Sequence, residues 1–97
     1  DFVRRTPDPV DPLERGNPGH GTTTASVIIS GVGGPDARAF VSGVAPKASL
    51  VPLRVTPSVV LLSFDRLAEA IRHAADHDCH VISMSLGGPV PSRALER

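Results

Sequence analysis

Residues 20–26, His20-Gly21-Thr22-Thr23-Thr24-Ala25-Ser26, are the most informative stretch of the chain. The turn Pro18-Gly19 precedes them, and the small residues that follow predict a helix beginning at the histidine. The N-terminus of a helix is electropositive, so an imidazole placed there stays neutral and can accept a proton near pH 7. A glycine beside the histidine leaves one side of the ring open to a nucleophile. The stretch predicts a general base at His20, with a helix cap or surface histidine as the simpler interpretation.

Two further motifs follow in order. Gly43-Val44-Ala45-Pro46 leads into the apolar residues 48–55, and residues 81–88 read Val-Ile-Ser-Met-Ser-Leu-Gly-Gly after an amphipathic stretch. With the histidine motif, they resemble the middle of a subtilisin-like serine protease domain (subtilase, peptidase family S8). That family has His-Gly-Thr-x-Val-Ala-Gly, then Gly-Val-Ala-Pro before a strand, then Met-Ser-Leu-Gly-Gly at a strand end. The resemblance covers residues 19–88, and more loosely the chain from Asp1.

Composition limits the classes of function. The chain has 97 residues and a formal net charge of zero, which gives one small domain with neither a basic field for nucleic acid nor an acidic tail. No apolar run is long enough to span a bilayer. A start at Asp1 rather than methionine suggests a fragment or a processed piece, and the resemblance implies a secreted or extracellular protein.

The order of elements predicts an α/β fold. Residues 1–19 form an irregular, proline-rich loop, and 20–30 form the histidine helix. A strand–helix–strand unit spans residues 48–86, with strands at 48–55 and 80–86. The resemblance implies that residues 1–97 are part of a subtilisin-like domain, with a parallel sheet covered by helices on both faces. The three-layer domain is incomplete here.

The helix inside that unit is expected to be amphipathic. Ser63 is a suitable N-cap, and Asp65 in the first turn complements the helix dipole. The buried face is predicted from apolar residues at helical spacing, namely Phe64, Leu67, Ile71, Ala74 and Ala75.

The resemblance implies a serine endopeptidase that uses a Ser-His-Asp triad, with His20 as its general base. The family's catalytic aspartate ends an upstream strand in an apolar-apolar-Asp-Ser/Thr-Gly pattern, and Asp1, Asp8 and Asp11 do not lie in that pattern. Its serine and its oxyanion asparagine lie downstream of the residues present. We therefore expect residues 1–97 alone to be inactive. Thr24 stands where the motif has valine, and its hydroxyl needs a partner such as a carbonyl one turn back.

The resemblance also implies a substrate cleft. Ser85, Leu86 and Gly87 would pair with a peptide or protein substrate as an added antiparallel strand. The structural alternative is a tight strand-to-loop turn. The opposite wall, usually glycine-rich, holds Leu61 and Leu62 here, with Phe64 and Leu67 near the next pocket. These larger side chains indicate a more apolar wall or a partly closed cleft.

The family places the aspartate-bearing strand between the strands at 48–55 and 81–86. That strand is missing from this chain, so the rest of the protease domain is needed to complete the sheet. Since unpaired buried backbone groups are costly, we expect the isolated residues to fold poorly or aggregate.

No cofactor and no metal are predicted. Many relatives bind a structural calcium in the loop that corresponds to residues 31–42, but Asp36 is the only carboxylate there, and calcium needs six or more oxygens. His73, His77, Cys79 and His80 could be read as metal ligands, but a structural role is favoured.

The sequence leaves two alternative functions. Residues 27–34 resemble a strand entering a glycine-rich phosphate loop, but the third glycine of the dinucleotide-binding pattern is absent and Pro35-Asp36 follows. The other alternative is a non-catalytic, protease-like domain that binds a peptide or a partner, because the nucleophile is not among these residues.

Overall fold

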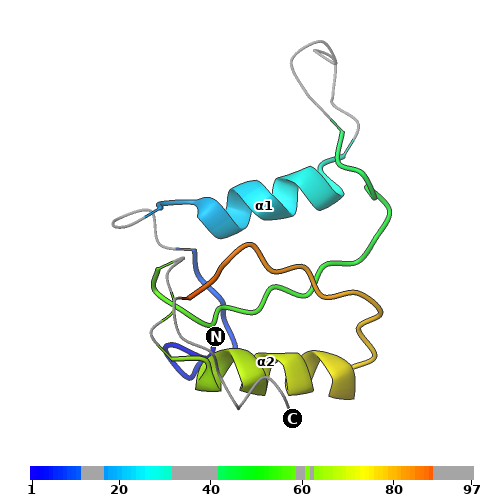
Figure 1. The fold of residues 1–97 in the computed structure, drawn as a ribbon. Helices are drawn as coiled ribbons and strands as arrows, with labels where there is room; N and C mark the ends of the chain where they lie inside the picture. The colour runs from blue at the N-terminus through cyan, green and yellow to red at the C-terminus, as the bar shows by residue number, and fades with distance from the viewer. Residues whose placement is uncertain (12–16, 32–41, 59–60, 62, 89–97) are drawn as a thin grey trace.

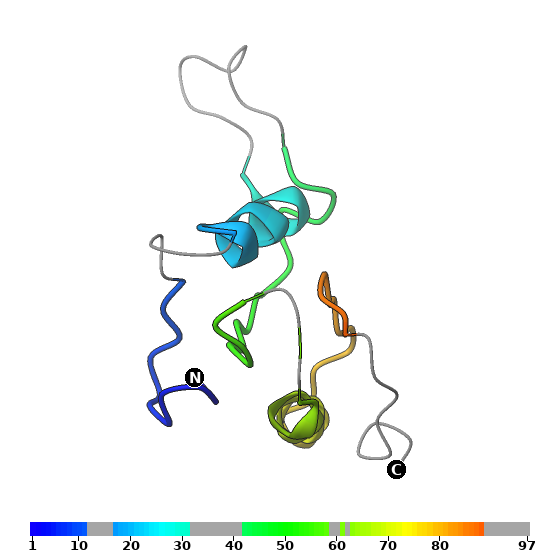
Figure 2. The same ribbon diagram turned by 60° about the vertical axis from the view of Figure 1, so that its left-hand side comes forward.

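The computed structural model describes residues 1–11, 17–31, 42–58, 61 and 63–88. In that part of the chain there are two helices, α1 (His20–Ile29) and α2 (Asp65–Asp76). Two extended segments, residues 49–56 and 81–86, run through the layer between the helices (Figures 1 and 2). The extended layer thus lies between the two helices. In this arrangement the N-terminal end of α1 is close to the end of the second extended segment.

Helix α1 begins where the sequence predicts, at His20. It starts from Gly19, whose φ of 72° is in the left-handed region that favours glycine. None of its residues is buried, and it is rich in β-branched residues of poor helix propensity. Contacts with other segments must therefore hold it.

The Gly-Val-Ala-Pro motif supplies one of these contacts at the C-terminal end of α1. The N–H groups of Gly43, Val44 and Ala45 donate to the carbonyls of Ser30, Val27 and Ile28 at 2.8, 3.0 and 2.8 Å. These bonds satisfy carbonyls that a helix end leaves without partners. A Cβ on Gly43 would lie 2.5 Å from the Ile28 carbonyl oxygen, so only glycine allows this approach.

Helix α2 is amphipathic, but two details of the sequence prediction are wrong. Its N-cap is Phe64 rather than Ser63. The Ser63 hydroxyl donates to the Asp65 carboxylate at 3.1 Å, and its oxygen accepts the Asp65 N–H only at 3.5 Å. Ala75 is exposed, and the buried residues of the helix are Leu67, Ala68, Ala70 and Ala74. Phe64 and Ile71 pack against the core from its edge.

The core is small and aliphatic. Val55, Leu61, Leu67 and Ala70 form its buried cluster, which lies between α2 and the extended layer. Partly buried side chains cover this cluster, namely Phe2, Leu53, Phe64, Ile71 and Leu86.

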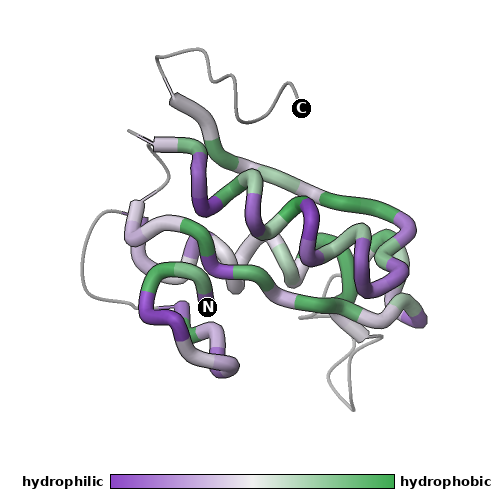
Figure 3. The backbone as a smooth tube through the Cα atoms, turned by 90° about the horizontal axis from the view of Figure 1, so that it is seen from below, coloured by the Kyte–Doolittle hydropathy of each residue, from purple (hydrophilic) through white to green (hydrophobic). Residues whose placement is uncertain are grey.

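The strands predicted at 48–55 and 80–86 are not seen as strands in the described part of the chain, where the secondary structure besides α1 and α2 is limited to turns and an isolated bridge at Gly87. Hydrophobic residues follow much of both extended segments (Figure 3). Several of them face solvent, with Val81 83% and Met84 51% exposed. A strand forms only when a neighbour takes up its backbone groups, and these two segments do not pair with each other.

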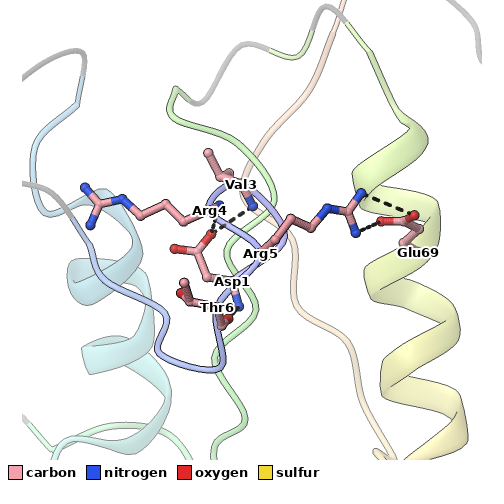
Figure 4. A network of polar contacts seen from close by, with 6 residues as sticks. All are labelled: Asp1, Val3, Arg4, Arg5, Thr6 and Glu69. Carbon is pink, nitrogen blue, oxygen red and sulfur yellow. Dashed lines mark hydrogen bonds and ion pairs between the residues drawn. The ribbon is translucent and has the colours of Figure 1, made fainter.

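The N-terminal turn is tied to the rest of the molecule by charges (Figure 4). The Asp1 carboxylate accepts the N–H groups of Val3 and Arg4 at 2.8 and 2.9 Å. Its other oxygen lies 3.2 Å from an Arg54 guanidinium nitrogen, and Arg5 pairs with Glu69 of α2 at 2.8 Å. The first residues thus join the extended layer to α2.

Candidate active site

His20 is the first residue of α1, and its imidazole lies against the second extended segment. Its Nε2 atom is 2.7 Å from the carbonyl oxygen of Ser85. A carbonyl oxygen only accepts hydrogen bonds, so Nε2 is the donor in this arrangement. Two segments that the sequence singles out separately therefore meet at one hydrogen bond.

Local hydrogen bonds fix the first turn of α1 around His20. The His20 N–H donates to the Asn17 carbonyl at 3.1 Å. The Thr24 hydroxyl donates to the His20 carbonyl at 3.1 Å and to the Gly21 carbonyl at 3.0 Å, so the expectation of a carbonyl one turn back is confirmed. This back-bonding satisfies the hydroxyl without a partner from another segment.

Ser85 and Leu86 end the second extended segment, and Gly87 follows them. The Ser85 carbonyl is the group of this stretch that contacts His20. Ser85 and Gly87 are exposed, whereas the Leu86 side chain packs against the core cluster. The Gly87 carbonyl accepts the N–H of Leu61 at 2.8 Å. Two backbone acceptors of this segment, at Ser85 and Gly87, are therefore occupied by groups of the chain itself.

Leu61, expected to form the opposite cleft wall, is 3% exposed and belongs to the core. Leu67 is buried in the same cluster, and Phe64 packs against it. A Cβ on Gly88 would clash with the Leu61 carbonyl and come within 2.8 Å of the Phe64 ring. Leu61, Phe64 and Leu67 therefore pack in or against the core of the described part of the chain. Leu62 lies outside the described residues.

Asp11 lies beside the first turn of α1, and the sequence alone assigns it no role. Its Oδ2 accepts the Thr22 N–H at 2.7 Å and the Thr22 hydroxyl at 2.6 Å. The two Thr22 hydrogen bonds, hydroxyl first, hold the pKa of Asp11 below its ordinary value of 3.8 against the opposing effect of burial. The Gly19 backbone and charge attraction to His20 lower this pKa further. An available signal was a carboxylate upstream of a helix that lacks a side-chain cap.

Metal ligands do not gather in the described part of the chain, where no three His, Cys, Asp or Glu side chains could hold an ion together. The His73 and His77 rings are stacked with centroids 4.0 Å apart, and His77 Nδ1 lies 2.7 Å from the His73 carbonyl oxygen. Cys79 is a free, half-buried thiol. Asp36, the one candidate calcium ligand, lies outside the described residues. The helices within the described ranges are also too short and too polar to cross a membrane.

A hollow of about 280 Å³ lies at the opposite end of α1 from His20. It is lined by Ser26, Val27, Ser30, Ser42 and Val44, and none of these side chains titrates. At a rise of about 1.5 Å per helical residue, this hollow is roughly 10 Å or more from the imidazole. It plays no part in the site.

Comparison with known proteins identifies the class to which this fold and site belong. The sequence profile of the Subtilase family matches residues 1–97. The chain is 34% identical over all of its 97 residues to thermitase of Thermoactinomyces vulgaris. It is 33% identical over 92 residues to subtilisin Savinase of Lederbergia lenta, and 37% identical over 79 residues to subtilisin DY of Bacillus licheniformis. The chain belongs to the subtilase family of serine proteases, peptidase family S8.

The chain covers only part of the length of these relatives. The chain spans 32% of the length of thermitase and of subtilisin Savinase, and 27% of subtilisin DY. No solved structure matches the chain. Membership of the family implies an α/β fold, of which the described residues show the helices and the extended segments.

Proposed function

We propose that the protein containing these residues is a serine endopeptidase, in which His20 is the general base and Ser85–Gly87 holds the substrate. The hydrogen bond between His20 Nε2 and the Ser85 carbonyl carries this proposal, since it joins a potential base to a potential peptide-binding edge. Serine proteases need this proximity, because the base must reach the nucleophile while the substrate lies beside it.

In the proposed reaction, the imidazole takes the proton of a serine hydroxyl as its oxygen attacks the scissile carbonyl. The C–N bond then breaks, and the imidazolium returns the proton to the leaving amine. Water hydrolyses the acyl-enzyme by the same proton transfers in reverse. The serine and the aspartate that orients the ring are supplied by other parts of the protease domain. This chemistry requires no cofactor.

Substrate binding would exchange hydrogen bonds rather than only add them. A peptide N–H that bonds to the Ser85 carbonyl would displace the Nε2–H of His20. With the ring proton then on Nδ1, where the aspartate of the triad would hold it, Nε2 could accept the serine proton. A second peptide N–H would displace the Leu61 N–H from the Gly87 carbonyl. Backbone pairing of this kind gives affinity for many sequences, with selectivity left to adjacent pockets.

The rest of the protease domain is the partner that we propose for the extended layer. Residues 49–56 and 81–86 lie in one layer without pairing, and Val51, Val81 and Met84 are exposed there. An inserted strand would take up the free backbone groups and cover these side chains. By family, we propose an extracellular location.

The test is His20→Ala in the intact protein, with His80→Ala as the control because His80 is exposed and lies before the second extended segment. Loss of the base should lower kcat by roughly 10⁴-fold or more, leave peptide affinity nearly unchanged and abolish labelling of the serine by a fluorophosphonate. Normal kcat in His20→Ala would contradict the assignment. A parent protein that binds peptides but cleaves none would instead support the non-catalytic alternative.

A further inference from the structure

The N-terminal end of α1 is held by a residue far outside the helix. The N-cap, Gly19, has no side chain to accept a hydrogen bond, and the first turn contains no acidic residue. Helix starts normally use such groups to satisfy the first backbone N–H donors. Here an upstream carboxylate, Asp11, takes that place.

Asp11 makes two contacts with the third residue of the helix. Its Oδ2 accepts both the backbone N–H and the hydroxyl of Thr22, at 2.7 and 2.6 Å. Both distances are short, as expected for bonds to a charged acceptor. Since Thr22 lies two residues after His20, these bonds hold the turn that carries the imidazole.

The site leaves room for this arrangement at Gly21. A Cβ on Gly21 would meet only the Asp11 carboxylate, with Oδ2 at 3.6 Å. The carboxylate therefore lies over the residue that joins His20 to Thr22. No hydrogen bond joins Asp11 to the imidazole among the described contacts, so Asp11 does not itself orient the ring nitrogens.

We propose that Asp11 is a positioning residue that holds the first turn of α1, and with it His20, in the place needed for proton transfer. The role rests on the proposed protease function. Its physical basis is the sensitivity of catalysis to geometry, because a displacement of about 1 Å at a catalytic group can cost about 100-fold in rate. The negative charge also lies at the positive end of the helix and attracts the imidazolium that forms during turnover.

The experiment compares three variants of the intact protein. Asp11→Ala removes the acceptor, Asp11→Asn keeps a neutral acceptor, and Asp8→Ala is the control. Asp8 lies exposed in the same loop, and its backbone carbonyl rather than its side chain accepts the Thr6 hydroxyl. kcat is expressed per active site titrated with a fluorophosphonate, so that misfolded protein does not count.

We expect Asp11→Ala to lower kcat per titrated site by about 10- to 100-fold, with KM changed by less than about threefold. Asp11→Asn should recover most of this loss, and Asp8→Ala should match the parent. Thr22→Val, which keeps the backbone donor, should fall between parent and Asp11→Ala. An unchanged kcat per site in Asp11→Ala would overturn the proposal and leave Asp11 as a stability element alone.

A second measurement separates this proposal from the proposed function. The intact protein is labelled with ¹³C-histidine, and the His20 ring signal is identified by its absence from His20→Ala. We expect this signal to move in Asp11→Ala, to return toward its parent position in Asp11→Asn, and to stay in place in Asp8→Ala. If the parent cleaves no peptide, the protease proposal fails but these shifts still test positioning. A His20 signal that does not move in Asp11→Ala overturns the proposal.

Discussion

His20 Nε2 and the Ser85 carbonyl oxygen lie 2.7 Å apart, although 64 residues separate them along the chain. The contact involves the backbone of Ser85, while the Ser85 side chain is exposed. The two residues thus contribute differently to the proposed site, His20 through its side chain and Ser85 through its main chain.

Ser85→Ala should therefore keep kcat/KM within about threefold of the parent, because the carbonyl that meets His20 is unchanged. Steady-state hydrolysis of a peptide substrate by the intact protein measures this, with His20→Ala as the inactive reference. A loss of more than about 100-fold would show that the hydroxyl itself takes part in the reaction.

Gly87 and Gly88 should separate substrate binding from stability. A Cβ at Gly88 would clash with the Leu61 carbonyl and the Phe64 ring, whereas a Cβ at Gly87 meets nothing within 4 Å. We expect Gly88→Ala to lower the free energy of unfolding by about 1–3 kcal/mol, and Gly87→Ala to change it by less than about 0.5 kcal/mol. Because Gly87 lies on the proposed peptide edge, its alanine variant should instead raise KM.

Chemical denaturation and peptide kinetics on both glycine variants make the comparison. Equal losses of stability would mean that the Gly88 side of the segment is not packed as described. An unchanged KM in Gly87→Ala would remove Gly87 from the peptide edge.

Two ion pairs differ in burial and should therefore differ in their contribution to the free energy of unfolding. Arg54 is 12% exposed and faces a fully buried Asp1 carboxylate, while Arg5 and Glu69 are 64% and 43% exposed. Removing one partner of a buried pair leaves the other charge uncompensated, so Arg54→Met should cost about 3 kcal/mol of unfolding free energy. Arg5→Met should cost less than about 0.5 kcal/mol, since water screens that pair. Similar values from urea denaturation would contradict the assignment of a buried pair.

Asp11 should give the folded protein an acid-sensitive contribution to stability. Its pKa is lower in the folded state than its ordinary 3.8, chiefly because of the Thr22 hydrogen bonds. A carboxyl with a depressed folded-state pKa stabilises above its unfolded-state pKa, and that stabilisation disappears as the pH falls through the folded-state value. Urea midpoints of the parent should therefore drop more steeply than those of Asp11→Asn below about pH 4. Parallel curves would show that the bonds to Thr22 contribute nothing.

The sequence predicted local features well where one segment decides them. The start of α1 at His20 and the Thr24 back-bond follow from residues within a single turn. The Gly-Val-Ala-Pro motif was recognised from the family, but its physical role was not, because the approach of Gly43 to Ile28 depends on how two segments dock. The contact of Asp11 with Thr22 is not predictable for the same reason, since it depends on how the loop lies over the helix.

The errors in α2 have equally local causes. Ser63 has the chemistry of an N-cap, but its hydroxyl is drawn to the Asp65 side chain and the helix starts one residue later than that cap would require. Ala75 fits the helical period, but it is the second-last residue of the helix and is exposed there, whereas Ala68 and Ala70 nearer the middle are buried. The period identified the amphipathic helix but not how far along its length the buried face extends.

The extended layer leads to the last prediction, that residues 1–97 expressed alone do not fold cooperatively. Val51, Val81, Ile82 and Met84 expose large fractions of their apolar surface. The adjoining backbone is not helical and the two extended segments form no strands, and the buried core of the described residues is small. At about 25 cal/mol per Å² of apolar surface, exposed side chains of this size forfeit a stabilisation comparable to the whole stability of a small domain. We expect aggregation, or a broad thermal change with a poorly dispersed amide spectrum, and recovery of a cooperative transition when the remainder of the protease domain is expressed with it. A sharp transition and a well-dispersed spectrum for the isolated residues would show that the layer is stable without an inserted strand.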